Sequence, residues 1–263
     1  MNQFKTTILA ASITSLTSLY LHASQEISVE KKFKISQVNN LDLENSSGDI
    51  TIKTDDKEAK VKVEKIYLTF DDLTKIENIS KNELTDSLNN AKDWLIISCY
   101  TGQRISDFMK FTDEQIRIEE GEHLIEFTQM KTGKNMTVPL HPKVLEILKK
   151  RNGKFPYRIS DQKYNDFIKT VCGLAKINEL TKGSKLVETE KDSKVYRKQS
   201  GTYKKYDLVT SHIGRRSFAT NFYGKIPTTY LIYATGHSTE SMFLNYIGKS
   251  NKDLALEITK YFK

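Results

Sequence analysis

Four short motifs carry most of the residues that could do chemistry on an anionic substrate. They read TGQRISD (residues 101–107), QMKTGKNMTVPL (129–140), TSHIGRRSFATN (210–221) and TGHSTESMFLNYI (235–247). The candidate site residues within them are Arg104, Lys131, His212, Arg215, His237 and Tyr246. An arginine guanidinium can make two parallel hydrogen bonds to the oxygens of one phosphate. A tyrosine hydroxyl can act as a nucleophile when a base and nearby cations activate it. Each motif alone is a weak signal, because most tyrosines pack and most surface cations are solvated.

The order and spacing of the four motifs resemble the catalytic domain of tyrosine recombinases, the phage integrase family, especially the integrases of mobile elements. In that family an arginine follows a TG-x turn, a lysine lies on a β-hairpin, and a His-x-x-Arg pair opens a later helix. A Gly-His pair then precedes the nucleophilic tyrosine by nine residues, which is the spacing from His237 to Tyr246. The resemblance covers about residues 66–263, three quarters of the chain.

The resemblance implies that four of these side chains bind the scissile DNA phosphate. Arg104 and Arg215 would clamp its nonbridging oxygens, whose negative charge grows in the transition state. His212 would donate to the same oxygens or assist in moving the tyrosine proton, and His237 would hydrogen-bond the phosphate. Asp107 is expected to orient Arg104 and to cap the following helix.

The remaining two residues would make and break the phosphodiester bond. Tyr246 would attack the phosphorus and form a 3′-phosphotyrosyl link, which a 5′ hydroxyl of another strand later reverses. Lys131 would protonate the 5′ oxygen as it leaves. The bond energy is conserved and the two arginines take the part of a divalent ion, so we expect no metal, no ATP and no other cofactor.

Charge also indicates a polyanionic partner, which the resemblance identifies as double-stranded DNA bound by a homotetramer. The net charge is +8, while residues 1–65 hold nine lysines and nine acidic residues, so the excess lies entirely in the remainder. Contacts with the DNA backbone are expected from Thr132, Lys134 and Arg216, and from a lysine-rich insertion at residues 182–205. The alternative for each is a solvated surface.

From residue 66 onward the pattern is mainly helical. A capping box at Thr69 and Asp72 opens one helix, and Gly102 ends the next. Residues 121–140 read as two strands around a turn at 132–135, and His141-Pro142 opens another helix. We therefore predict an α+β fold, a mainly helical catalytic domain with a small three-stranded antiparallel sheet. The last helix (251–262) is expected to dock on a neighbouring subunit, or else on its own domain.

Residues 1–65 do not match the family, whose members usually carry a helical core-binding domain at this place. Residues 1–23 resemble a secretory leader, with Lys5 at the start and Leu21-His22-Ala23 as a cleavage site; the alternative is an amphipathic helix. Residues 24–65 alternate apolar and polar side chains and predict a short β-rich segment. Residues 1–65 are interpreted as a fused fragment, as a rearranged remnant of a mobile element, or as a small domain whose role the sequence does not indicate.

Three alternatives to a recombinase stay open at this point. A catalytically impaired integrase remnant would bind DNA without cutting it, and a type IB topoisomerase would use the same chemistry without a defined site. An exported β-rich surface protein would follow from residues 1–65. The family resemblance favours the cytoplasm and a catalytic domain without membrane contact. Cys99 and Cys172 form no disulfide framework, which also suits a reducing compartment.

Overall fold

The computed structural model describes residues 65–189, 193 and 195–262, together with the backbone of four strands nearer the N-terminus. The chain forms two compact units. One comprises Ile66–Glu240, and the other combines Met1–Lys65 with Ser241–Lys263.

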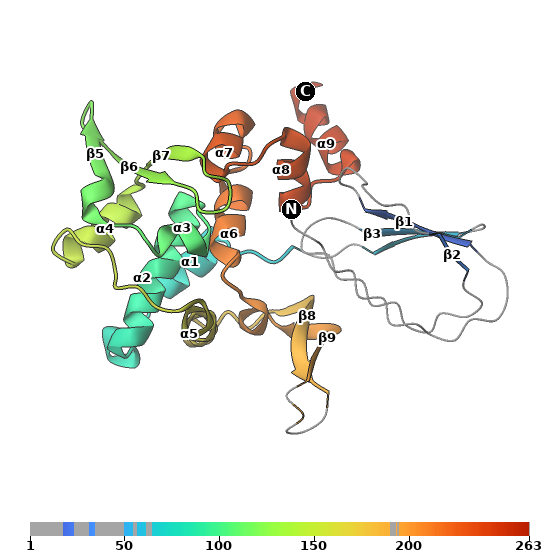
Figure 1. Ribbon diagram of the computed structural model, residues 1–263, viewed down its shortest axis with the longest axis horizontal. Helices are drawn as coiled ribbons and strands as arrows, with labels where there is room; N and C mark the ends of the chain where they lie inside the picture. Colours follow the sequence, from blue (N-terminus) through green and yellow to red (C-terminus); the bar gives the residue numbers. More distant parts are fainter. Residues whose placement is uncertain are drawn as a thin grey trace. The chain divides into compact units, whose positions relative to one another are not determined.

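The larger unit is built around one central helix, α2 (Asp86–Thr101) (Figure 1). This helix packs against α1 (Phe70–Glu77), α4 (Pro142–Lys150), α5 (Asp161–Leu174) and α6 (Ile213–Phe222). Because neighbours surround it, ten of its residues are buried, from Asn90 to Thr101. The largest buried side chains of the core are Trp94, Tyr164 and Phe108. The helices α3 (Ile105–Phe108) and α7 (Thr228–Thr235) complete this unit.

The helix boundaries arise from the signals present in the sequence. Thr69 and Asp72 form the predicted capping box at the start of α1. Gly102, with a φ of 70°, ends α2 in the left-handed conformation that side chains disfavour. Pro142 occupies the first turn of α4, where its missing N–H leaves no helical hydrogen bond unmade. These predicted boundaries are confirmed.

Two antiparallel sheets accompany the helices. The first has the order β5-β6-β7, formed by Ile116–Glu119, Glu122–Thr128 and Asn135–Pro139. In its second hairpin Thr128 pairs with Asn135, so the QMKTGK segment forms the connecting turn. The second sheet is a hairpin of β8 (Leu180–Glu188) and β9 (Tyr196–Lys204), at the place of the predicted insertion. The unit is thus a mainly helical domain with small antiparallel sheets, as expected.

The second unit contains four described strands and the C-terminal helices. Strands β1 (Ser18–Ala23), β2 (Lys32–Lys34), β3 (Ile50–Thr54) and β4 (Lys57–Val61) pair in the antiparallel order β2-β1-β3-β4. Helix α8 (Glu240–Ile247) runs into this unit and is followed by α9 (Asn251–Ile258) and the short helix η4 (Thr259–Phe262).

Part of the predicted N-terminal organisation lies outside the described residues. This holds for residues 1–17 of the leader and for parts of the β-rich segment predicted at residues 24–65. The boundaries at residues 23 and 65 stay predictions. In the part of the chain that is described, no helix has the length and apolar character needed to cross a membrane.

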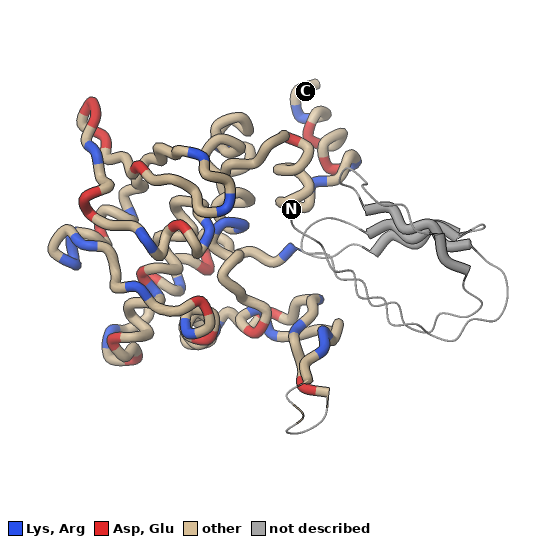
Figure 2. The backbone as a smooth tube through the Cα atoms, in the orientation of Figure 1, with Lys and Arg blue, Asp and Glu red and all other residues tan. Residues whose placement is uncertain are grey.

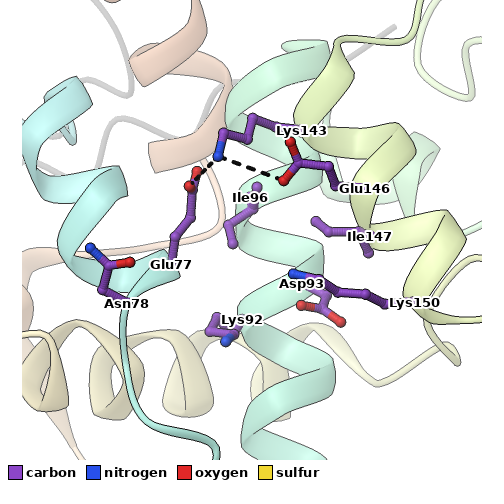
Figure 3. Close-up of a pocket in the computed structure, with 9 residues that line it drawn as sticks. All are labelled: Glu77, Asn78, Lys92, Asp93, Ile96, Lys143, Glu146, Ile147 and Lys150. Carbon is purple, nitrogen blue, oxygen red and sulfur yellow. Dashed lines mark hydrogen bonds and ion pairs between the residues drawn. The ribbon is translucent and has the colours of Figure 1, made fainter.

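A surface hollow lies between α1, α2 and α4 (Figure 3). Charged groups line it, and Lys143 Nζ bridges Glu77 at 2.8 Å and Glu146 at 3.7 Å. Its lining residues are Glu77, Asn78, Lys92, Asp93, Ile96, Lys143, Glu146, Ile147 and Lys150. None of them belongs to the four motifs, so the hollow is not the candidate site.

Candidate active site

Arg104 stands in the turn that follows the central helix. Gly102 reverses the chain, and Arg104 is the residue before α3. The half-buried guanidinium donates from Nη1 to Gln129 Oε1, at 3.3 Å. A Cβ atom at Gly102 would lie 2.5 Å from the Phe218 ring, so glycine allows this turn to pack on α6. The first predicted arginine therefore follows a turn that packs on α6, and its side chain is bonded to Gln129 before the β6–β7 turn.

Lys131 is exposed in the turn between β6 and β7. The turn is closed by Gln129 N donating to Lys134 O, at 2.9 Å, and by Gly133 N donating to Gln129 O, at 2.8 Å. Asp107 Oδ1 accepts from Met130 N at 2.8 Å, which ties the turn to α3. Asp107 was expected to orient Arg104 and to cap the following helix. The capping prediction is wrong, because Asp107 lies inside α3, and the hydrogen bond found here fixes the backbone beside Lys131.

Arg215 lies inside the domain and connects three segments. The residue is 3% exposed on the first turn of α6. Its Nη1 donates to Gly102 O at 3.0 Å, and its Nη2 donates to Thr235 O. The guanidinium therefore joins the end of α2 to the end of α7. His212, three residues earlier, is exposed at the N-terminus of α6.

His237 follows the left-handed Gly236 that ends α7. Its Nδ1 lies 2.7 Å from Thr235 Oγ1, which is also 2.5 Å from Leu231 O. The hydroxyl has one hydrogen. If it bonds Leu231 O, Nδ1 must be the imidazole donor. If it bonds Nδ1, the hydrogen of the neutral ring lies on Nε2, which can then donate to a phosphate.

Electrostatic coupling shows that five of the predicted side chains converge. Partial loss of hydration lowers the pKa of His212, and so do Arg216, Arg215, Arg104 and Lys131 around it. Burial first, and then the charges of Arg215 and Arg104, lower the pKa of His237 to about 3. Both imidazoles are therefore neutral at pH 7 and surrounded by the positive charges that act on them. Figure 2 marks the positions of Lys and Arg along the backbone. Such a cluster is suited to binding a phosphate dianion or monoanion.

Tyr246, the sixth predicted residue, belongs to the other unit. It lies half-buried near the end of α8, between the buried Phe243 and Ile247. Its role as nucleophile stays a prediction.

The three expected DNA-backbone contacts surround the cluster. Thr132 Oγ1 donates to Gln129 Oε1 at 2.8 Å, so its hydroxyl is occupied within the turn. Lys134 is exposed, with its Nζ 5.2 Å from the centre of the Tyr233 ring. Arg216 is half-buried and among the charges that act on His212. The roles of all three in DNA binding stay predictions.

Sequence reasoning missed the buried polar residues between these side chains. Gln103 and Gln129 are 0% and 1% exposed, and Thr235 is 0% exposed. Each stands one or two residues before a predicted residue, but a polar residue at such a place is usually solvated. The hydrophobic periodicity of the sequence does not distinguish these buried polar residues from surface residues. Only their position inside the motifs could have indicated that they belong to the site.

Comparison with known proteins assigns the family. The sequence profile described as the phage integrase family matches residues 66–253. The chain belongs to the phage integrase family. This confirms the family resemblance in the motifs and its start at residue 66. Curated proteins gave no significant match.

Solved structures share the fold of this family member at low sequence identity. XerH recombinase bound to difH substrate aligns with a TM-score of 0.51 and 16% identity, covering 77% of this chain and 56% of that one. XerA recombinase gives 0.51 and 14%, covering 75% and 65%. The Tn1549 transposon integrase, in complex with circular intermediate DNA, gives 0.50 and 15%, covering 76% and 68%. The chain thus spans about half to two thirds of the length of these proteins.

Proposed function

We propose that this phage integrase family member is a site-specific DNA recombinase that cuts and rejoins strands through a covalent link to Tyr246. The observation that carries the proposal is the convergence of Arg104, Arg215 and Lys131 around His212, with both arginines also acting on His237. Five side chains from four separate motifs meet in one cationic cluster. A phosphodiester is the group in DNA that such a cluster would bind.

The clustered residues would stabilise the transition state of phosphoryl transfer. Arg104 Nη1 donates to Gln129 Oε1, and both terminal nitrogens of Arg215 donate to backbone carbonyls. Donors fixed in this way need little reorganisation as charge develops on the phosphate. A guanidinium is a cation throughout the pH range in which proteins fold, so Arg215 carries its charge in its buried position. A neutral His237 or His212 can add a hydrogen bond from a protonated ring nitrogen.

The reaction itself would exchange one oxygen for another on phosphorus. The Tyr246 oxygen forms the new P–O bond as the bond to the 5′ oxygen breaks. The phenol proton leaves to a base, for which neutral His212 is suited, and Lys131 gives a proton to the departing 5′ oxygen. Lys131 lies in an exposed turn, where it can reach a substrate from outside. Attack by a 5′ hydroxyl on the phosphotyrosine reverses each transfer.

DNA capture would involve the surface around this cluster and a homotetramer. The solved XerH and Tn1549 structures hold DNA, which supports duplex DNA as the substrate proposed here. Tyr261 and Phe262, near the C-terminus, are 88% and 81% exposed, as a segment that docks on a neighbouring subunit would be. A DNA enzyme of this kind would act on the nucleoid in the cytoplasm.

The proposal is tested by trapping the covalent intermediate. A pool of nicked duplexes with randomised sequence loses a short fragment after cleavage, so the reverse reaction is blocked. We expect the wild-type chain to form a protein–DNA adduct that survives denaturing electrophoresis, and Tyr246→Phe to form none, a loss of at least about 1,000-fold.

Other outcomes of this experiment identify the alternatives. An adduct that persists in Tyr246→Phe would contradict the assignment of the nucleophile. Salt-dependent binding without any adduct would identify a catalytically impaired DNA-binding remnant. Relaxation of supercoiled plasmid without a preferred sequence would identify a topoisomerase. A mature N-terminus at Ser24 in an extracytoplasmic fraction would favour the exported protein instead.

A further inference from the structure

We propose that Gln103 and Gln129 form a buried amide relay that positions Arg104 and the turn carrying Lys131 against the turn carrying His237. Both are positioning residues and would not touch the substrate. The inference rests on the proposed function for its catalytic consequence, while the relay itself is a structural statement that can be tested separately.

The relay begins at two backbone carbonyls. Gln103 Nε2 donates one hydrogen to Thr101 O, at 2.8 Å, and the other to Ala234 O, at 2.7 Å. Carbonyl oxygens accept only, so the amide nitrogen of Gln103 must face them. Its oxygen must then face the other way, towards Gln129. The end of α2 and the last turn of α7 are thereby joined through one buried side chain.

The amide of Gln129 continues the relay in the same donor-to-acceptor order. Gln129 Nε2 lies 3.5 Å from Gln103 Oε1 and donates to it. The Gln129 oxygen consequently points away from Gln103 and accepts from Arg104 Nη1 at 3.3 Å and from Thr132 Oγ1 at 2.8 Å. Thr132 directly follows Lys131, so this second bond holds the lysine turn. The direction of these hydrogen bonds thus turns the Gln129 oxygen, and not its amide nitrogen, towards the Arg104 guanidinium.

Close packing leaves this relay little freedom. A Cβ atom at Gly236 would lie 2.8 Å from Gln129 Nε2 and 2.9 Å from its Oε1. Glycine next to His237 therefore lets the amide occupy the space beneath that turn. Buried amides without partners are strongly destabilising, so the side chains hold one arrangement. Catalytic groups must be held to within about 0.5 Å, and buried hydrogen-bonded neighbours supply that constraint.

An isosteric substitution tests the relay. Gln129→Met keeps the volume and removes the acceptor and donor, and Asn90→Leu is the matched control. Asn90 is also a fully buried amide, but it bonds the Tyr157 backbone instead of the motif residues. Hydrogen exchange should rise in Gln129→Met at both residues 129–134 and 234–237. In Asn90→Leu it should rise around residue 157 and not in those two segments. This readout requires no catalytic activity.

The catalytic consequence is measured with nicked duplex at saturating concentration. We expect the single-turnover rate constant of adduct formation to fall about 30- to 100-fold in Gln129→Met, as for a misplacement near 1 Å. The Kd for DNA should change less than about threefold, and Asn90→Leu should keep the wild-type rate constant. Because Gln129 acts on Arg104 as well as on the Lys131 turn, Gln129→Met should slow an Arg104→Lys enzyme by less than it slows the wild type.

The outcomes separate the two proposals. If the wild-type chain forms no adduct, the proposed function fails while the exchange data still decide whether the relay exists. The relay is overturned if exchange in the two segments is unchanged. Its catalytic role is overturned by a Gln129→Met rate constant within threefold of wild type. An equal slowing in Asn90→Leu, or independent effects of Gln129→Met and Arg104→Lys, would also overturn it.

Discussion

Burial and the neighbouring cations together lower the pKa values of two histidines in this site. His237 and His212 both have a lowered pKa, and loss of hydration is the first cause for each. Two arginines act on both rings, so a neutral imidazole is the stable form until an anion arrives. A bound phosphate would oppose the arginine charges and raise both pKa values. DNA binding should therefore be accompanied by proton uptake near the lower end of the physiological pH range.

The depressed pKa of His237 predicts loss of stability in acid. The unfolded chain binds a proton on this ring below pH 6.5, whereas the folded chain does so only near pH 3. Stability contributed by the neutral ring is thus present above pH 6.5 and lost as the pH falls towards 3. Between pH 7 and pH 5 the wild type should lose about 1–2 kcal/mol more unfolding free energy than His237→Gln. Urea titrations at both pH values measure this difference, and equal losses would contradict the predicted protonation.

At the scale of elements, the close approach of α2 and α6 places the arginines. Gly214 lies in α6, next to Arg215, and a Cβ atom there would be 1.9 Å from Ser98 Oγ and 3.0 Å from the Ser98 carbonyl carbon. The helices can meet at this distance only because one of them has no side chain at the crossing. This contact brings the Arg215 guanidinium within reach of Gly102 O.

Alanine substitutions at two helical glycines should distinguish the effect of helix packing on stability from the effect of helix propensity. Gly214→Ala should destabilise the protein by about 1–3 kcal/mol, since the added methyl overlaps α2. Gly173→Ala is the control in α5, because its Cβ would meet Tyr206 at an ordinary 3.8 Å. That change should be neutral or stabilise by up to about 1 kcal/mol. Thermal unfolding of both variants tests the prediction, which would be wrong if they shifted Tm alike.

At the scale of the whole molecule, exposed positive charge also lies outside the candidate site, on the β8–β9 hairpin. Lys182 and Lys198 are exposed on one face of the β8–β9 hairpin, and within the described residues neither makes an ion pair. The opposite face is anchored, since a Cβ at Gly183 would lie 2.7 Å from Leu208. A fixed hairpin with a free cationic face is suited to DNA phosphates.

The hairpin should contribute to the salt dependence of DNA binding. Replacing Lys182 and Lys198 together by Glu should weaken binding and reduce the slope of log K against log salt by about 2. Lys81 and Lys149, also exposed, give a control pair with the same change in net charge. Fluorescence anisotropy between about 50 and 200 mM salt compares the pairs. Equal slopes for the two double variants would show that only net charge matters.

The sequence by itself determined the family, the helix boundaries and the identity of the clustered residues. Local chemistry was sufficient for these: Gly102 must end a helix where φ is positive, and Pro142 must lie in a first turn. The motif order also predicted that Arg104, Lys131 and Arg215 belong together, although nothing local says how they meet.

Only the tertiary structure decided what holds those residues in place. The bond from Asp107 to the Met130 backbone and the relay through Gln103 and Gln129 join segments that are far apart in sequence. Hydrogen bonds between such segments depend on the packing of α2, α6, α7 and the β6–β7 turn, and a polar side chain carries no local mark of that future burial. Sequence pattern therefore indicates which groups would act on phosphate, while long-range packing determines their orientation.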